Sequence, residues 1–145
     1  MTESRRAQIA KQFIEAIPHS QALGMSLREI SNGVAVMELP YDERLIGDPS
    51  TGVLAGGAVT ALLDTCAGAS VVAREEVTSA TATLDLRIDY MRAADPGRTL
   101  GARAECYRLT RSVAFVRAEA WTDTRDRPVA TATGAFTVST KRPKT

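Results

Sequence analysis

Histidine and cysteine are scarce in this sequence of 145 residues. There is one histidine, His19, and the two cysteines, Cys66 and Cys106, do not form a Cys-x-x-Cys pair. A single histidine argues against a multi-histidine metal site and against a Ser-His-Asp triad. Cysteines with this spacing favour reduced thiols in the core of a cytoplasmic protein. We therefore expect no metal site and no resident cofactor.

An excess of charge of either sign is also lacking. The 18 basic and 17 acidic residues give a net charge of +1, so there is no electrostatic argument for nucleic acid or an anionic membrane as a partner. The longest apolar stretch contains polar residues and is too short to span a bilayer. The N-terminal segment lacks the continuous apolar region of a secretory signal. We expect a cytoplasmic protein that binds neither nucleic acid nor membranes.

No internal repeat, linker or low-complexity run divides the chain, whose length suits one domain with a real core. We predict a single domain over residues 1–145. Apolar residues recur at helical spacing over residues 4–17, and Pro18 ends that pattern. The sequence thus predicts an N-terminal helix within residues 1–20. Residues 141–145 are predicted to form a frayed, flexible tail.

The most informative stretch begins with a glycine-rich turn and continues as a predicted helix over residues 56–74. Nearly all faces of this helix carry apolar or small residues, and a helix that is apolar all round is normally buried. Asp64 lies in the middle of it. Because a carboxylate loses several kcal/mol or more of hydration when it is buried, it is rarely placed inside a protein without a partner or a task.

The remaining pattern is mostly that of strands. Residues 26–30 and 34–39 flank an Asn-Gly turn, the strongest short signal for a hairpin, and a loop rich in glycine and proline follows over residues 41–52. Four longer segments then alternate apolar and polar residues: 79–91, 99–109, 112–123 and 129–139. In the first of these, alternation assigns Leu84, Leu86, Ile88 and Tyr90 to one face and Asp85, Arg87 and Asp89 to the other.

This order predicts an α+β fold in which one long curved antiparallel sheet wraps around a central hydrophobic helix. Such a sheet leaves edge strands, and pairing of two subunits edge to edge would remove one of them. We therefore expect a homodimer.

Several motifs carry a resemblance to a known family. They are Thr-Gly-Val-Leu-Ala-Gly-Gly-Ala at residues 51–58, Leu-Leu-Asp at 62–64, Leu-Gly-Met at 23–25, the strand at 83–91 with Pro-Gly at 96–97, and Ala-Thr-Ala-Thr-Gly-Ala-Phe at 130–136. Over about residues 23–138 the chain resembles the hotdog-fold acyl-CoA thioesterases, in particular the phenylacetyl-CoA thioesterase-like branch. The resemblance implies a hotdog fold and a homo-oligomer, either a dimer or a dimer of dimers.

The resemblance also implies roles for particular residues. Asp64 would be the nucleophile or the general base that directs water at the thioester, and a backbone amide of Gly56 or Gly57 would form the oxyanion hole. The first N–H groups of a helix lack internal partners and lie at its positive end, which suits a developing oxyanion. Thr83, or as a second choice Thr81, would orient the water. The acid would come from one subunit and the glycine from the other.

Four further residues would contact the substrate. Arg111 and Ser112, in a tight turn between strands, correspond to the place where this family meets the nucleotide end of coenzyme A. Asp48 lies in the loop where the family usually has asparagine, although aspartate is also a typical turn residue. Ala55 stands where the family usually has histidine, so a donor that helps to place the thioester is missing.

The resemblance therefore implies an acyl-CoA thioesterase that hydrolyses a small or medium acyl-CoA thioester, aromatic acyl groups included. Coenzyme A would enter as part of the substrate. Ala55 keeps a second possibility open, namely a protein that binds an acyl-CoA or another apolar ligand with little or no hydrolysis. A third possibility is a structural oligomer in which Asp64 serves an interface. Cys66 is interpreted as a small core residue because nothing near it in the sequence would lower its pKa.

Overall fold

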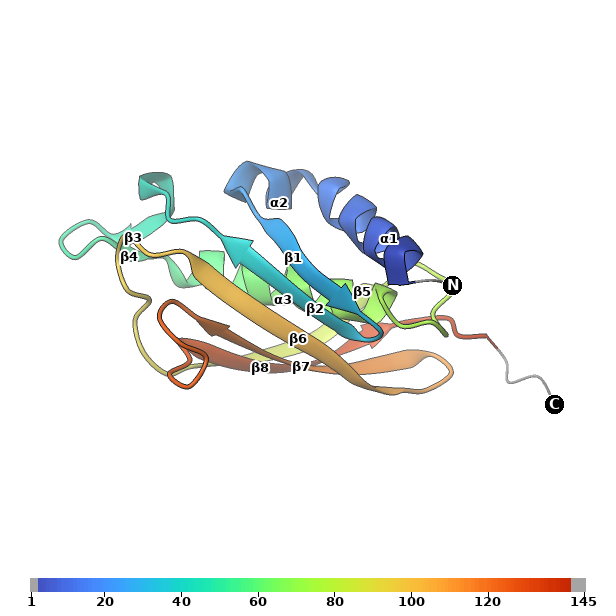
Figure 1. The fold of residues 1–145 in the computed structure, drawn as a ribbon. Helices are drawn as coiled ribbons and strands as arrows, with labels where there is room; N and C mark the ends of the chain where they lie inside the picture. Colours follow the sequence, from blue (N-terminus) through green and yellow to red (C-terminus); the bar gives the residue numbers. More distant parts are fainter. Residues whose placement is uncertain (1–2, 142–145) are drawn as a thin grey trace.

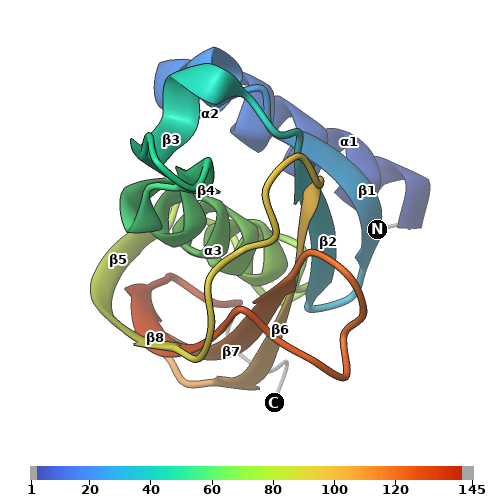
Figure 2. The ribbon, with the colours of Figure 1, turned by 90° about the vertical axis from the view of Figure 1, so that its left-hand side faces the viewer.

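Six antiparallel strands form one sheet that curves around a single long helix (Figures 1 and 2). A computed structural model describes residues 3–141 of the chain. The helices are α1 (Glu3–Glu15), α2 (Pro18–Leu23) and α3 (Gly56–Val72), with a short 3-10 turn, η1 (Glu43–Leu45). The long strands are β1 (Ser26–Ser31), β2 (Val34–Leu39), β5 (Ala82–Tyr90), β6 (Leu100–Leu109), β7 (Val113–Trp121) and β8 (Ala130–Thr137).

The strand order in the sheet is β1-β2-β6-β7-β8-β5. Consecutive strands β6, β7 and β8 form a meander, whereas β5 follows α3 and pairs with β8 at the far edge. The strands β3 (Ile46–Asp48) and β4 (Val53–Leu54) form a separate small ladder just before α3. The predicted α+β arrangement of one long antiparallel sheet around a central helix is therefore confirmed.

The contact between α3 and the sheet depends on small side chains. The inward positions of β6 and β7 are mostly alanine, and all of them are buried: Ala102, Ala104, Ala114, Ala118 and Ala120. Leucine, valine and cysteine side chains of α3 fill the space over these alanines, which lets the helix lie in the concave face of the sheet (Figure 2). The alternation expected for these two strands is confirmed by their burial.

The N-terminal segment differs from its prediction. It contains two helices rather than one, because Pro18 is the first residue of α2 and does not merely end α1. Proline is favoured at that position, since its missing N–H has no partner in the first turn of a helix. Helix α2 ends at Gly24, whose left-handed φ of 81° suits glycine. Residues 1–2 and, apart from Lys141, the tail predicted at 141–145 lie outside the described residues.

A β-bulge in β5 is a feature that simple alternation did not predict. Thr83 pairs with Phe136 and Asp85 with Ala135, so Leu84 is an extra residue on this strand. Without the bulge, Thr83 would lie on the same face as Asp85, away from α3. A bulge redirects side chains by one step, and here it turns Thr83 toward the helix. It also leaves Leu84 59% exposed, and the predicted alternation of faces does not hold at this residue.

The other predicted elements agree with the structure to within a few residues. The central helix ends at Val72, two residues before its predicted end at Arg74. The predicted loop over residues 41–52 also contains η1, β3 and the approach to β4, which were not predicted. Within residues 3–141, no helix is long and apolar enough to cross a membrane.

The bulge generates a stability prediction at Gly134, the residue of β8 beside it. A Cβ atom on residue 134 would lie 2.6 Å from the carbonyl oxygen of Asp85. We expect Gly134→Ala to lower the free energy of unfolding by about 1–3 kcal/mol, as overpacked sites do. Urea unfolding measures this value. The control is Thr133→Ala, an exposed position of the same strand, which is expected to change it by less than about 1 kcal/mol. Equal stability of Gly134→Ala and wild type would contradict the bulge geometry.

Candidate active site

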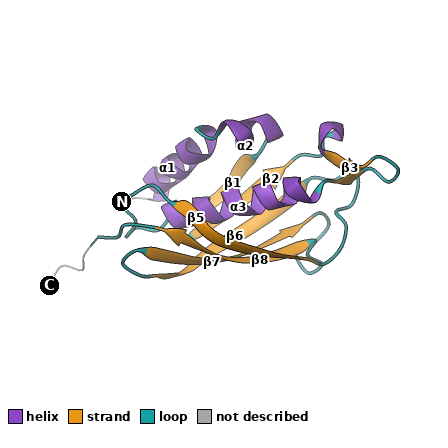
Figure 3. Ribbon diagram, turned by 180° about the vertical axis from the view of Figure 1, so that it is seen from behind, coloured by secondary structure: helices purple, strands orange, loops and turns teal. Residues whose placement is uncertain are grey.

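One stripe of α3 is not covered by the sheet. Its members recur at spacings of three and four residues, as neighbours on a helix surface do, and they line a cleft of about 370 Å³. These are Gly57, Thr60, Ala61, Asp64, Thr65 and Gly68. The other walls come from β5 and β8 and from the N-terminal helices. Figure 3 shows β5 running beside α3 at this side of the molecule. The predicted acid, one predicted glycine and both predicted threonines therefore share one cleft.

The Asp64 carboxylate has a defined partner in this cleft. The hydroxyl of Thr83 donates a hydrogen bond of 2.7 Å to Asp64 Oδ1. Since that hydroxyl carries one hydrogen, the Thr83 oxygen can act only as an acceptor toward any further group. Within residues 3–141 no other hydrogen bond to this carboxylate is found, so Oδ2 has no hydrogen-bond partner there. Asp64 is half-buried rather than fully enclosed, because it lies on the open stripe of the helix.

Helix α3 begins without a side-chain cap. Ala55 is the N-cap residue and makes no capping hydrogen bond, and the N–H of Ala58 donates to the carbonyl of Ala55 at 3.0 Å. The N–H groups of Gly56 and Gly57 have no hydrogen-bond partner in the part of the chain that the structure describes. These two groups lie at the positive end of a 17-residue helix. Gly57 lines the cleft, whereas Gly56 is not among the lining residues.

Asp48 lies outside this cleft, at the end of β3 where the turn to β4 begins. Its carboxylate accepts hydrogen bonds from the Ser50 backbone N–H, the Ser50 hydroxyl and the Thr51 hydroxyl, at 2.7 to 3.0 Å. These hydrogen bonds, from the Ser50 side chain first, hold the pKa of the Asp48 carboxyl below its ordinary value. The geometry is that of an aspartate turn. In this single chain Asp48 therefore shapes the loop that leads into α3.

Arg111 and Ser112 lie in a different cavity, at the opposite end of α3 from Gly56. This cavity has a volume of about 730 Å³. Its lining includes three basic side chains, from Arg74, Arg111 and Lys141, and one acidic side chain, from Glu76. Arg74 and Glu76 form an ion pair of 3.0 Å, so two cations remain for a ligand. The cavity suits an anionic group.

The N-terminal helices supply a wall of the cleft that the sequence analysis missed. Phe13 and Ile17, together with His19 and Ser20, line it opposite Asp64. Ser20 is buried, and its hydroxyl is 3.5 Å from that of Thr65 on α3. The only histidine of the chain thus lies in the same cleft as Asp64. No motif in the sequence connected the two, because they are far apart along the chain.

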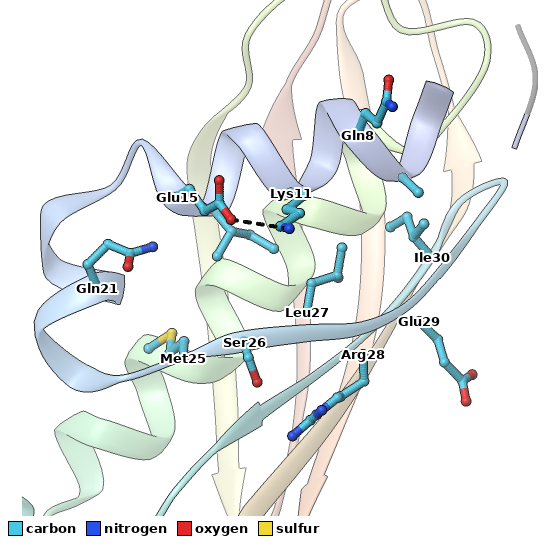
Figure 4. Close-up of a pocket in the computed structure, with 12 residues that line it drawn as sticks. Gln8, Lys11, Glu15, Gln21, Met25, Ser26, Leu27, Arg28, Glu29 and Ile30 are labelled. Carbon is cyan, nitrogen blue, oxygen red and sulfur yellow. Dashed lines mark ion pairs between the residues drawn. The ribbon is translucent and has the colours of Figure 1, made fainter. Parts of the chain in front are cut away.

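A groove between α1 and β1 has a larger volume, about 500 Å³, but holds none of the predicted site residues. Figure 4 shows its apolar floor, which includes Met25, Leu27 and Ile30, below the polar side chains of α1. Lys11 and Glu15 at its rim are 3.7 Å apart and form an ion pair. The groove therefore presents paired charges and lacks an acid with a positioned hydroxyl. We assign the candidate active site to the Asp64 cleft.

Residues 51–129 of the chain match the thioesterase superfamily. The chain belongs to the thioesterase superfamily. A protein from Halobacterium salinarum, described as a candidate esterase, is 35% identical over 75 residues, which are 50% of each chain. The chain thus spans about half the length of this curated relative. The expected resemblance to hotdog-fold thioesterases is confirmed.

Solved structures support the same fold for this thioesterase superfamily chain. A Pseudomonas aeruginosa protein is 39% identical, covers 91% of this chain with 98% of its own length, and superposes with a TM-score of 0.83. A mutant of the phenylacetic acid degradation protein PaaI from Thermus thermophilus is 27% identical, with coverage of 83% and 98% and a TM-score of 0.72. The predicted hotdog fold is confirmed by these structures.

Cys66 is buried in the core of this superfamily chain and does not line the Asp64 cleft. Among residues 3–141, no three or more His, Cys, Asp or Glu side chains are grouped to hold a metal ion. Cys66 is on the buried face of α3, and its thiol points to the carbonyl oxygens of Ala35 and Ala102 at 3.4 and 3.7 Å. Burial raises the pKa of the Cys66 thiol from 9.0 to about 12. The thiol is therefore protonated at neutral pH and is not a nucleophile.

This raised pKa predicts a loss of stability at alkaline pH. The unfolded chain releases the Cys66 proton near pH 9.0, whereas the folded chain keeps it up to about pH 12, so the free energy of unfolding falls as the pH rises between these values. Urea unfolding at about pH 8 and about pH 10 measures this fall. We expect it to be larger in wild type than in Cys66→Ala by on the order of 1 kcal/mol. Equal falls would show that the thiol also ionises in the folded protein.

Proposed function

We propose that this protein is an acyl-CoA thioesterase in which Asp64 acts as nucleophile or general base. The observation that carries the proposal is the hydrogen bond from Thr83 to Asp64 Oδ1 in a cleft beside unpartnered amides. It leaves Asp64 Oδ2 free to accept a proton and the Thr83 oxygen free to accept from a water molecule. Membership of the thioesterase superfamily supports thioester hydrolysis as the reaction.

As a general base, Asp64 would take one proton from a water molecule whose other hydrogen is held by Thr83. The water oxygen would bond to the thioester carbon, and the carbonyl oxygen would become an oxyanion. When the carbon–sulfur bond breaks, the proton held by Asp64 neutralises the leaving thiolate. As a nucleophile, Asp64 Oδ2 would itself bond to the thioester carbon, the carbon–sulfur bond would break, and the thiolate of coenzyme A would leave behind an anhydride. Water would open this anhydride, which releases the acyl group as a carboxylic acid, regenerates the Asp64 carboxylate and supplies the proton of the thiol. Both routes use the same oxygen atom and the same oxyanion donor.

The length of α3 supports a site that is shared by two subunits. Gly57 and Asp64 are seven residues apart on this helix, which separates them by about 10 Å along its axis at 1.5 Å per residue. The oxyanion and the attacking oxygen of one thioester are bonded to the same carbon, so they are much closer together than that. The partner subunit's Gly57, brought in across a two-fold axis, would remove this mismatch.

The walls of the cleft support a small or medium acyl group. Phe13, Ile17, Ala61 and Phe136 give it an apolar lining, and its volume of about 370 Å³ is at the lower end for ligand pockets. Aromatic acyl groups belong in the test, because the Thermus thermophilus relative is named for phenylacetic acid degradation. For the nucleotide end of coenzyme A we propose the basic cavity at Arg111 and Ser112. The guanidinium of Arg111 suits its phosphates.

A second candidate function is acyl-CoA binding without turnover. It is favoured by Ala55, which gives the start of α3 no side-chain donor. This function predicts saturable binding of acyl-CoA esters with negligible thiol release by the wild-type protein. Ala55→His would then be expected to raise the rate of thiol release. Rapid hydrolysis of any ester by wild type would exclude it.

The proposed thioesterase is tested by thiol release from short, medium, long and aromatic acyl-CoA esters. We expect Asp64→Asn to lower kcat by about 10²–10⁴-fold, since it removes the proton acceptor or nucleophile and keeps the shape of the side chain. The matched control is Asp126→Asn, an exposed carboxylate of the β7–β8 loop, which is expected to leave kcat unchanged. An unchanged rate for Asp64→Asn would refute the proposed role of Asp64.

The dimer that this site requires is proposed to form along β5. Of the four large apolar side chains that are strongly exposed in the described chain, three lie on β5 or directly after it: Leu84, Tyr90 and Met91, at 59, 51 and 57% exposure. The fourth, Tyr107, lies on β6 and is 45% exposed. Strand β5 is also an edge strand, so its outer backbone groups can pair with a second copy.

We expect Leu84→Arg to shift the protein from dimer to monomer, because it puts two like charges near each other in the pairing of two β5 strands. Sedimentation equilibrium measures the change, and it also shows whether two dimers associate further. The control is Tyr107→Arg, which makes the same change away from β5 and is expected to leave the dimer intact. A dimer that tolerates Leu84→Arg and dissociates with Tyr107→Arg would place the interface elsewhere.

A further inference from the structure

Tyr90, the last residue of β5, reaches the first turn of α3. Its hydroxyl is 2.8 Å from the carbonyl oxygen of Gly56 and within hydrogen-bond distance of the Thr60 hydroxyl. A carbonyl oxygen can only accept, so the single phenolic hydrogen goes to Gly56. Thr60 must then donate its own hydrogen to Tyr90. The directions of both hydrogen bonds are thereby fixed, although Tyr90 is half exposed to solvent.

The carbonyl that Tyr90 holds belongs to the same peptide group as the N–H of Gly57. Because a peptide group is planar, fixing its oxygen also fixes the direction of its N–H. A hydrogen bond accepted at the oxygen polarises the group and strengthens the N–H as a donor. The peptide joins two glycines, the residues with the greatest backbone freedom. The Tyr90 hydroxyl adds to the hydrogen bonding of this carbonyl within the first turn of α3.

Tyr90 also packs against Gly56. Its hydroxyl oxygen and two ring carbons are 3.5 to 3.6 Å from the position that a Cβ on residue 56 would take. Thr60, which donates to Tyr90, lines the cleft together with Gly57 and Asp64. The hydroxyl of Thr60 is thus turned toward Tyr90, and only its lone pairs are available to the cleft. No other side chain in residues 3–141 donates a hydrogen bond to the Gly56 carbonyl.

We propose that Tyr90 is a positioning residue that aims and polarises the Gly57 N–H, the oxyanion donor. The inference rests on the proposed thioesterase function. Tyr90 acts through the Gly56–Gly57 peptide and does not touch the reacting atoms. Its hydroxyl improves a donor that matters most when the carbonyl oxygen becomes charged, so its loss affects kcat more than KM.

The kinetic test is Tyr90→Phe, which removes the hydroxyl and keeps the ring against Gly56. Complete loss of an oxyanion donor lowers kcat about 10²–10³-fold. Since the Gly57 N–H remains in this variant, we expect a smaller fall in kcat, about tenfold, with KM within about twofold of wild type. The control is Tyr107→Phe, which removes a half-exposed hydroxyl from β6 and is expected to leave both constants unchanged. An unchanged kcat for Tyr90→Phe, or a change confined to KM, would overturn the inference.

The Gly57 amide gives a second readout that does not depend on turnover. In Tyr90→Phe we expect the Gly56 carbonyl carbon and the Gly57 amide proton both to move upfield in NMR spectra, while Tyr107→Phe leaves them in place. A wild-type protein that hydrolyses no thioester would overturn the proposed function, and with it the catalytic purpose of this contact. An active wild type in which Tyr90→Phe leaves the Gly57 amide unmoved would overturn only the role of Tyr90.

Discussion

The arrangement of this protein depends on how much of one helix a curved sheet can cover. Helix α3 is apolar on most of its surface, and the alanines of β6 and β7 let it approach the sheet closely. The sheet reaches around only part of the helix, so a stripe from Gly57 to Asp64 lines a cleft, while Gly68 on the same stripe is buried beneath Phe13. Asp64, the one charged residue of α3, lies on that stripe. The burial of α3 thus determines both the core and the place of the cleft.

Each hydroxyl at the cleft has one hydrogen, and this determines which group donates in each hydrogen bond. Thr83 gives its hydrogen to Asp64, and Thr60 gives its hydrogen to Tyr90, which in turn donates to the Gly56 carbonyl. Both threonines therefore offer only acceptors to a bound molecule. Gly57 lines the same cleft, but it is seven residues before Asp64, about 10 Å along the helix axis. The surface near Asp64 therefore suits a group with a hydrogen to give.

The sequence predicts most of the fold because periodicity reports burial directly. The alternation in β6 and β7 and the apolar surface of α3 gave the correct elements within a few residues. The bulge at Leu84 was not predictable in this way, because one extra residue changes the pairing without changing the local composition. Its signal is Gly134 on the neighbouring strand, where the Asp85 carbonyl leaves no room for a side chain.

The sequence predicts those residues of the cleft that belong to short motifs, and it does not predict those that reach the cleft through the packing of separate helices. Asp64, Gly57 and Thr83 belong to sequence motifs, and all three line one cleft. His19 and Phe13 belong to no motif. They line the same cleft because the N-terminal helices pack beside α3. The carboxylate of Asp48, which the resemblance places among the substrate contacts, accepts short-range hydrogen bonds from Ser50 and Thr51 in this chain.

The N-terminal helices cross α3 at Gly68, where the Phe13 ring lies 3.3 Å from the position of a missing Cβ. They contribute one wall of the cleft and none of the hydrogen bonds that hold Asp64 or the Gly56–Gly57 peptide. Two of the four apolar side chains named in the lining, Phe13 and Ile17, thus come from a part of the chain that holds neither Asp64 nor the Gly56–Gly57 peptide. Substitutions at these two residues can reshape the cavity and leave the Thr83–Asp64 and Tyr90–Gly56 hydrogen bonds in place. A fold built in this way can change what its cleft accommodates during evolution while its polar groups stay constant.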